Sequence, residues 1–272
     1  MPTIADYFQS VQLPTMPEVA QLLIQSLNDD EIPFEKVRAA ISRDPALTVK
    51  LIRLANSARF GLQRKVSSVD DAITMVGLNQ VRTLCLAACM SDSFPMAPGL
   101  NREEFWKESM ACAGFAHWLA RTVGADVQQS WLTGFMIRLG ELIIAQKDPG
   151  KLQEIERLPH APGGRWERET RLVGFSEGEV AAELAQRWNF PAEVSRGLAT
   201  SSDPLAHKPF CRLGGIVHIA MFLAEIAVES PTTADATIDA LPADVLKTLQ
   251  LDHDYLKAHL PDVNTFTDAS AM

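Results

Sequence analysis

Six histidines and four cysteines are the side chains of this sequence best suited to metal binding or nucleophilic catalysis. No histidine is followed four residues later by another, so no helix carries the paired imidazoles of an HExxH zinc site. The GxSxG, Walker lysine and GxGxxG patterns are also missing from the sequence. Glu103 and Glu104 begin a predicted helix, where carboxylates favour the positive end of the dipole. The residues alone therefore indicate no active site.

The cysteines and the two histidines in apolar segments are better explained as core residues. Cys85 and Cys89 are four residues apart and the other two cysteines are isolated, without a CxxC pair. This spacing is typical of neither a disulfide framework nor a zinc ribbon, and we expect buried free thiols. His117 and His218 lie in apolar helical segments, so we expect core or boundary histidines rather than ligands.

Almost every segment of the chain has apolar residues at helical spacing, and alternating strand patterns are missing. Start signals such as Asp44-Pro45 and the Ser176…Glu179 box support several boundaries. The sequence therefore predicts an all-α fold. The main helices are expected near residues 19–27, 34–42, 45–58, 72–76, 81–90, 102–123, 126–147, 177–188 and 210–229.

The stretch Phe94–Gly99 is rich in proline and interrupts the helical pattern. We therefore expect a two-lobed helical bundle, with an N-terminal helical lobe over residues 1–93 and a second helical lobe over residues 94–230. Residues 231–272 are predicted to form a C-terminal extension of two short helices, near 242–251 and 254–260, with a frayed tail from Pro261. Residues 159–165, with two prolines and two glycines, are predicted to form an exposed loop.

Charge and hydropathy exclude several classes of protein. The 272 residues carry a formal charge of −9, which disfavours binding along a nucleic-acid backbone. The longest apolar stretch, residues 216–228, contains a histidine and a glutamate and is too short to cross a membrane. The first residues lack the basic and apolar regions of a secretory signal. We therefore expect a cytoplasmic, soluble protein that binds neither nucleic acid nor membranes.

Motifs in the first lobe resemble those of the HDOD family, the signal-output relatives of HD-type metal phosphohydrolases. In order along the chain they are Leu13–Val19, Ile41–Thr48, Leu54–Gly61, Val66–Val69, Ala72-Ile73 and Gly77–Asn79, and they include Asp44, Pro45, Asn56, Ser57 and Gly77. The resemblance covers residues 13 to 225. In structural terms, we expect Asp44 to cap a helix and Gly77 to end one, while Asn56 and Ser57 bind neighbouring backbone groups.

The second lobe resembles an HD hydrolase whose metal ligands have been replaced. Glu108 stands at a histidine position, Ile137-Arg138 replaces the His-Asp pair, Glu177 takes the next histidine position, and Ser201-Ser202 replaces a later His-His. Isoleucine has no lone pair, arginine is a fixed cation, and serine is a poor ligand compared with imidazole or carboxylate. We therefore expect no metal, no cofactor and no enzyme activity. Arg138 is instead expected to form a buried ion pair with Glu108 or Glu177.

The resemblance implies a non-catalytic bacterial protein of signal transduction that acts through protein–protein contacts, in a pathway that can be linked to cyclic nucleotides. Its output would pass through a protein partner, a ligand or self-association into a homo-oligomer. The alternative is a sensor that binds a nucleotide or small anion in the former metal pocket through Arg138, Ser201 and Ser202. Glu108 and Glu177 oppose this alternative because they repel anions. An active metal-dependent phosphohydrolase is the least favoured hypothesis.

Overall fold

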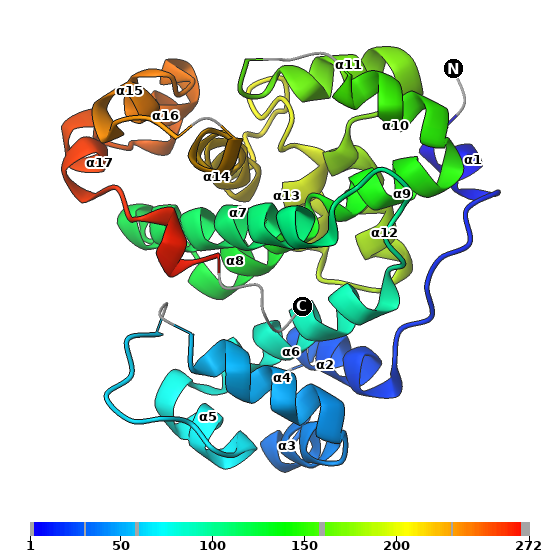
Figure 1. The fold of residues 1–272 in the computed structure, drawn as a ribbon, viewed down its shortest axis with the longest axis vertical. Coiled ribbons are helices and arrows are strands. Elements are labelled where there is room, and N and C mark those ends of the chain that lie inside the picture. Colours follow the sequence, from blue (N-terminus) through cyan, green and yellow to red (C-terminus); the bar gives the residue numbers. More distant parts are fainter. Residues whose placement is uncertain (1–2, 30, 58–59, 158–160, 230, 268–272) are drawn as a thin grey trace.

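The computed structural model of the chain is a bundle of helices (Figure 1). It describes residues 3–29, 31–57, 60–157, 161–229 and 231–267, and within these ranges there is no β-strand. The predicted all-α fold is confirmed. In the described ranges, no helix combines the length and the hydropathy needed to span a bilayer. The motif residues Ala58 and Arg59 fall outside these ranges.

Five of the six N-terminal helices, α2 to α6, form one group at the bottom of Figure 1. The first helix, α1, lies apart from them and contacts α12 (Glu177–Arg187). The start signals of the group act as the sequence predicts: the Asp44 carboxylate accepts from the Leu47 N–H at 3.0 Å, with Pro45 as the first helical residue. Gly77, with φ of 89°, ends one helix and immediately precedes the next. The helices are α1 (Ile4–Phe8), α2 (Glu18–Asn28), α3 (Phe34–Ser42), α4 (Pro45–Ala55), α5 (Val69–Val76) and α6 (Leu78–Ser93).

The second group is built around α7, a 22-residue helix that packs mainly against α8 and α14. Asn101 caps its start by accepting from two backbone N–H groups, and Gly124 ends it in the left-handed conformation. The helices of this group are α7 (Arg102–Val123), α8 (Val127–Met136), α9 (Leu139–Lys147), α10 (Pro149–Glu156), α11 (Gly164–Val173), α12 (Glu177–Arg187), α13 (Ala192–Ala199) and α14 (Arg212–Glu229).

The single helix predicted over residues 126–147 is wrong, because the chain turns at Ile137 and Arg138 between α8 and α9. Apolar residues on both sides of the turn are buried, so the sequence pattern continues across it without a visible break. After the turn, Gly140 lies directly against the backbone of α12. A Cβ at this position would be 1.9 Å from the Glu177 carbonyl oxygen. The turn therefore allows α9 to pack closely on α12.

The C-terminal extension forms α15 (Ala234–Asp239), α16 (Ala243–Leu249), α17 (His253–His259) and a short 3-10 helix, η2 (Val263–Thr265). The two short predicted helices are present, and α15 was missed. The expectation of a frayed tail from Pro261 is wrong for its described residues. The Phe266 ring lies against Gly114 of α7 and meets the Phe115 ring edge-on at 5.3 Å. A glycine on α7 thus provides the space that this aromatic ring fills.

The two groups of helices share an extensive boundary. Helix α6 contacts α2, α4 and α5 and also packs on α8. A hydrogen bond of 2.8 Å from the Asn28 side chain to the Asn189 carbonyl also links the groups. The proposed lobe boundaries at residues 93 and 230 remain a prediction.

Candidate functional site

The positions that the resemblance relates to HD metal ligands lie on several elements of the second helix group. Glu108 lies on α7, Ile137 and Arg138 form the turn between α8 and α9, and Glu177 is the first residue of α12. Glu108, Arg138 and Glu177 line a single cleft, and the Ile137 side chain is fully buried. The structure therefore brings three of the predicted site residues together.

Ser201 and Ser202 follow α13 and do not line this cleft. The Ser201 hydroxyl donates to the Leu198 carbonyl at 2.7 Å, and the Ser176 hydroxyl donates to that of Ser202 at 3.2 Å. Ser201 thus binds the backbone at the end of α13, and Ser202 contacts Ser176, the residue that caps α12. Their hydroxyls are not available to a ligand in the cleft.

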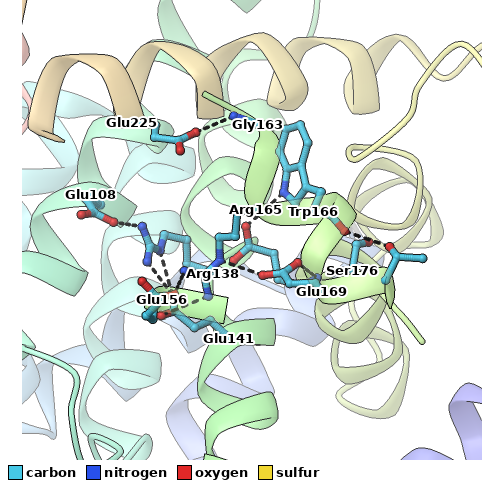
Figure 2. Close-up of polar contacts among 12 residues, drawn as sticks. Glu108, Arg138, Glu141, Glu156, Gly163, Arg165, Trp166, Glu169, Ser176 and Glu225 are labelled. Carbon is cyan, nitrogen blue, oxygen red and sulfur yellow. Dashed lines mark hydrogen bonds and ion pairs between the residues drawn. The ribbon is translucent and has the colours of Figure 1, made fainter. Parts of the chain in front are cut away.

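Arg138 is the central cation of the cleft (Figure 2). Its guanidinium forms an ion pair with Glu108 and a second one with Glu141, at 2.5 Å. The expected buried pair between Arg138 and Glu108 is confirmed. Because Glu141 is fully buried, its charge depends on this pairing. Burial alone would raise the pKa of Glu141, but Arg138 and Arg165 outweigh it and lower that pKa.

A second arginine, Arg165, also lines the cleft and extends the ion-pair network (Figure 2). It contacts Glu141 at 3.2 Å and Glu169 at 2.7 Å, and it also pairs with Glu156. The predicted exposed loop over residues 159–165 is wrong at its end, because α11 begins at Gly164 and the Arg165 side chain is buried. Residues 161–163 lie outside a helix, and residues 159 and 160 fall outside the described ranges. The network therefore joins α7, α9, α10 and α11 by ionic contacts.

Glu177 is fully buried and has little compensation for a negative charge. One of its carboxylate oxygens accepts from the Trp166 indole N–H at 3.2 Å, while the other has no hydrogen-bond partner. Its backbone N–H donates to Glu169 at 2.7 Å, which places two carboxyl groups close together. Burial, together with the Glu169 charge, raises the pKa of Glu177 to about 8. Burial and the neighbouring Glu169 therefore favour the protonated form of Glu177.

Sequence reasoning missed four members of the network: Glu141, Glu156, Arg165 and Glu169. The available signal was their spacing, since Arg138 and Glu141 are three residues apart and Arg165 and Glu169 are four apart on one helix. This spacing is also common on exposed helix faces. The sequence could therefore suggest the pairs but not their burial.

His218 is a core histidine, as expected. Burial lowers its pKa, so the ring is neutral, and its Nδ1 lies 2.6 Å from the Ser201 carbonyl oxygen. Because a carbonyl only accepts, Nδ1 carries the proton. The ring stacks on Trp166 with centroids 4.9 Å apart. His218 thus helps to orient the indole that donates to Glu177.

The donor set of the cleft does not fit a divalent metal. Arg138 contributes a fixed positive charge to the cleft, and Ile137 offers no lone pair. Across the described residues, no three His, Cys, Asp or Glu side chains are grouped to hold a metal ion. The cleft has a volume of about 20 Å³, which is room for about one water molecule. The arrangement is therefore suited to joining helices rather than to binding a substrate.

The motif residues of the first lobe have structural contacts. The Asn56 side chain donates to the Val66 carbonyl and accepts from the Val66 N–H, both at 2.8 Å, and the Ser57 hydroxyl donates to the Leu54 carbonyl at 2.7 Å. Asn56 thus fastens the segment before α5 to the end of α4. The hydrogen bonds expected for Asn56 and Ser57 are present.

Solved structures with the same fold come from several bacteria. A protein from Shewanella amazonensis SB2B named "Putative phosphohydrolase" superposes with a TM-score of 0.80 at 24% identity, over 96% of this chain and 95% of that one. An HDOD domain protein with unknown function from Geobacter sulfurreducens gives a TM-score of 0.78 at 21% identity, over 98% and 96% of the two chains. At these identities the likeness concerns the fold.

Sequence comparison gives the family. A protein of Treponema pallidum (strain Nichols), named "Uncharacterized protein", is 28% identical over 197 residues, which cover 71% of this chain. The match covers only 37% of that longer relative. The HDOD domain profile matches residues 13–204, which include every motif residue and vestigial ligand position discussed above. The chain therefore belongs to the HDOD domain family.

Proposed function

We propose that this protein is a non-catalytic regulatory protein of bacterial signal transduction that acts through contacts with a protein partner. The observation that carries the proposal is the position of Arg138. Its guanidinium forms ion pairs with Glu108 and Glu141, and the resemblance to HD hydrolases would put a metal ligand at position 138. A cleft neutralised and filled in this way supports a structural role for the former active site.

The family supports the regulatory part of the proposal. The fold is also shared by a protein from Marinobacter aquaeolei VT8 named "Putative signal transduction protein", with a TM-score of 0.75 at 20% identity. The cytoplasm is the compartment that we propose, in keeping with four free cysteines and an acidic composition. Neither nucleic acid nor membrane is a proposed partner.

The non-catalytic part is tested by metal analysis and phosphodiester hydrolysis. Freshly purified protein, before and after incubation with manganese, iron or zinc, is analysed for bound metal and assayed on a general phosphodiester and on cyclic dinucleotides. We expect substoichiometric metal and no turnover above that of Arg138→Met. Stoichiometric metal with turnover that the substitution abolishes would show that the proposal is wrong.

The regulatory part is tested by crosslinking in cells of the source bacterium, followed by reconstitution of the complex from purified components. We expect a saturable complex of fixed stoichiometry with a signalling protein, or with a second copy of the chain. A chain that remains monomeric and yields no complex that can be reconstituted would contradict the proposal.

The alternative function is a sensor of a nucleotide or small anion in the Arg138 cleft. The cleft volume of about 20 Å³ disfavours it, since a nucleotide would have to break the Arg138 ion pairs on entry. A thermal-shift panel of guanine nucleotides separates the two functions. A ligand at 100 times its dissociation constant stabilises a protein by about 2.7 kcal/mol, which is easily detected.

A further inference from the structure

A second cavity, of about 220 Å³, opens where α8, α13 and the start of α14 meet. None of its lining residues lines the Arg138 cleft. Two arginines, a serine and a cysteine are among them: Arg196, Arg212, Ser130 and Cys211. This cavity is over ten times larger than the Arg138 cleft, so a small molecule can enter it.

The two arginines are held in place without being neutralised. The Arg196 guanidinium donates to the Pro209 carbonyl at 3.1 Å, and that of Arg212 donates to the Val123 carbonyl. In the part of the chain that the structure describes, neither guanidinium forms an ion pair with a carboxylate. A guanidinium has five N–H donors, so each keeps donors for another group. The carbonyl contacts therefore orient two unneutralised cations at one cavity.

The start of α14 adds further donors and positive potential. This helix has 18 residues, no acidic residue in its first turn, and Arg212 as its first residue. The first N–H groups of a helix have no partner within it and lie at the positive end of the dipole. The Gly214 N–H is bound by the Cys211 sulfur at 3.4 Å. An anion at this helix start would be stabilised by the dipole and by Arg212 together.

Ser130 provides an independent observation that points to a ligand in this cavity. This residue of α8 lines the cavity and is 1% exposed, and its hydroxyl oxygen has no hydrogen-bond partner. A buried hydroxyl without a partner is destabilising, and a ligand oxygen would satisfy it.

Two carboxylates also line the cavity. Asp126 already accepts from the N–H groups of Gln128 and Gln129, both at 2.9 Å, so its charge is offset by the cap of α8. Glu193 lies at the exposed edge of the cavity, where solvent screens its charge. The inner wall therefore favours a negatively charged ligand.

We propose that this cavity binds the phosphoryl group of a small phosphorylated molecule. Arg196 and Arg212 contact its oxygens from two sides, the first turn of α14 contributes N–H groups, and Ser130 donates from the inner wall. A phosphoryl group has three terminal oxygens, which suits two guanidinium groups and a helix start better than a carboxylate does. The remaining volume accommodates a small organic group. The proposal is independent of the regulatory function proposed above.

Calorimetric titration of the full chain in chloride buffer tests the proposal, with inorganic phosphate, phenyl phosphate and acetate at matched ionic strength as probes. We expect saturable one-to-one binding of both phosphate probes and weaker binding of acetate. Arg196→Gln and Arg212→Gln each change an exposed side chain, so folding is retained. Each should weaken phosphate binding by a factor of about 10.

The matched control is Arg53→Gln, which makes the same charge change at an exposed position on α4 and should bind phosphate as the wild type does.

Alkylation of Cys211, followed by mass spectrometry, reports on the cavity directly and should slow down when phosphate is bound. Ser130→Ala should weaken phosphate binding and raise the thermal stability of the phosphate-free protein slightly, because it removes a buried hydroxyl without a partner. Equal binding by wild type, Arg212→Gln and Arg53→Gln, or no binding beyond that of chloride, would overturn the proposal.

Discussion

Arg138 illustrates how one side chain can replace the function of a metal in holding helices together. It bridges Glu108 on α7 and Glu141 on α9, and its side chain is only 12% exposed. A metal ion between carboxylates would make a similar link with a larger charge. The difference is that an arginine cannot exchange with solvent and cannot activate water.

Arg138→Met removes the cation that pairs with Glu108 and leaves the buried Glu141 with Arg165 alone. Removal of one partner from a buried ion pair typically costs about 3–5 kcal/mol, and we expect a loss of about 3 kcal/mol in the free energy of unfolding. Urea denaturation measures this loss. The matched control is Arg38→Met, at an exposed pair with Glu35 and Asp70, which should cost less than about 1 kcal/mol. Equal losses for both variants would contradict the structural role of Arg138.

The raised pKa of Glu177 makes the free energy of unfolding decrease as the pH rises. Its folded pKa of about 8 lies above the ordinary value of 4.5, so between these values the folded protein binds more protons than the unfolded chain. The free energy of unfolding therefore decreases over this range, by at most about 1.4 kcal/mol per pH unit for one proton. Above about pH 8 the carboxyl is ionised in both states and this decrease ends.

Glu177→Gln removes the titrating group and keeps an oxygen that can accept from Trp166. We expect the stability of the wild type to fall relative to that of the variant between pH 5 and pH 8. Urea denaturation at intervals of half a pH unit measures the difference. Parallel stability curves over this range would show that Glu177 is ionised in the folded protein.

The residues of the cleft could be found from the sequence only where a family motif marks them. Glu108, Arg138 and Glu177 stand at motif positions, and the opposite charges of Arg138 and Glu108 suggested their contact. Arg165 has no such marker, and a run of glycine and proline before it favoured an exposed loop. Its burial follows from the packing of α11, which the local sequence pattern does not encode.

At the scale of the helices, the close packing of α9 on α12 depends on a residue without a side chain. Gly140→Ala would place a methyl group 1.9 Å from the Glu177 carbonyl oxygen, so the two helices would have to move apart. We expect a loss of about 3 kcal/mol in stability. Gly150→Ala in α10 is the matched control, because its Cβ would be 3.4 Å from the nearest side chain, an Asp148 carboxylate oxygen.

The Gly150→Ala control should be neutral or should stabilise the protein by up to about 1 kcal/mol, since alanine favours helix. Thermal denaturation of the two variants side by side measures both effects. A Gly140→Ala protein as stable as the Gly150→Ala protein would mean that α9 and α12 are not in close contact.

Helix boundaries were predictable where a cap or a breaker marks them, as at Asp44, Gly77 and Gly124. The turn at Ile137 and Arg138 has no such residue, and apolar side chains continue through it. It forms because α9 gains contacts with α12 that a continuous helix would lose. Such a turn is decided by tertiary packing, so the local sequence could not reveal it.

For the molecule as a whole, the C-terminal segment acts as a strap across α7. Phe266→Ala should lower the free energy of unfolding by about 1–2 kcal/mol, because the ring is partly buried against Gly114 and Phe115. It should also speed amide hydrogen exchange in η2. Leu205→Ala, at a side chain 40% exposed, is the control and should change stability by less than about 0.5 kcal/mol. Unchanged exchange in η2 would show that Phe266 does not hold the segment.

The ion-pair network also restricts how this sequence could evolve. A single change of Arg138 to aspartate would add a third acid beside Glu108 and Glu141 and would leave Arg165 as the cation that contacts Glu141. A single change of Ile137 to histidine would place an imidazole in a fully buried apolar position. Every first step toward a His-Asp pair therefore passes through a destabilised intermediate. The ion pairs of Arg138 therefore oppose single substitutions that would replace this arginine with an acid.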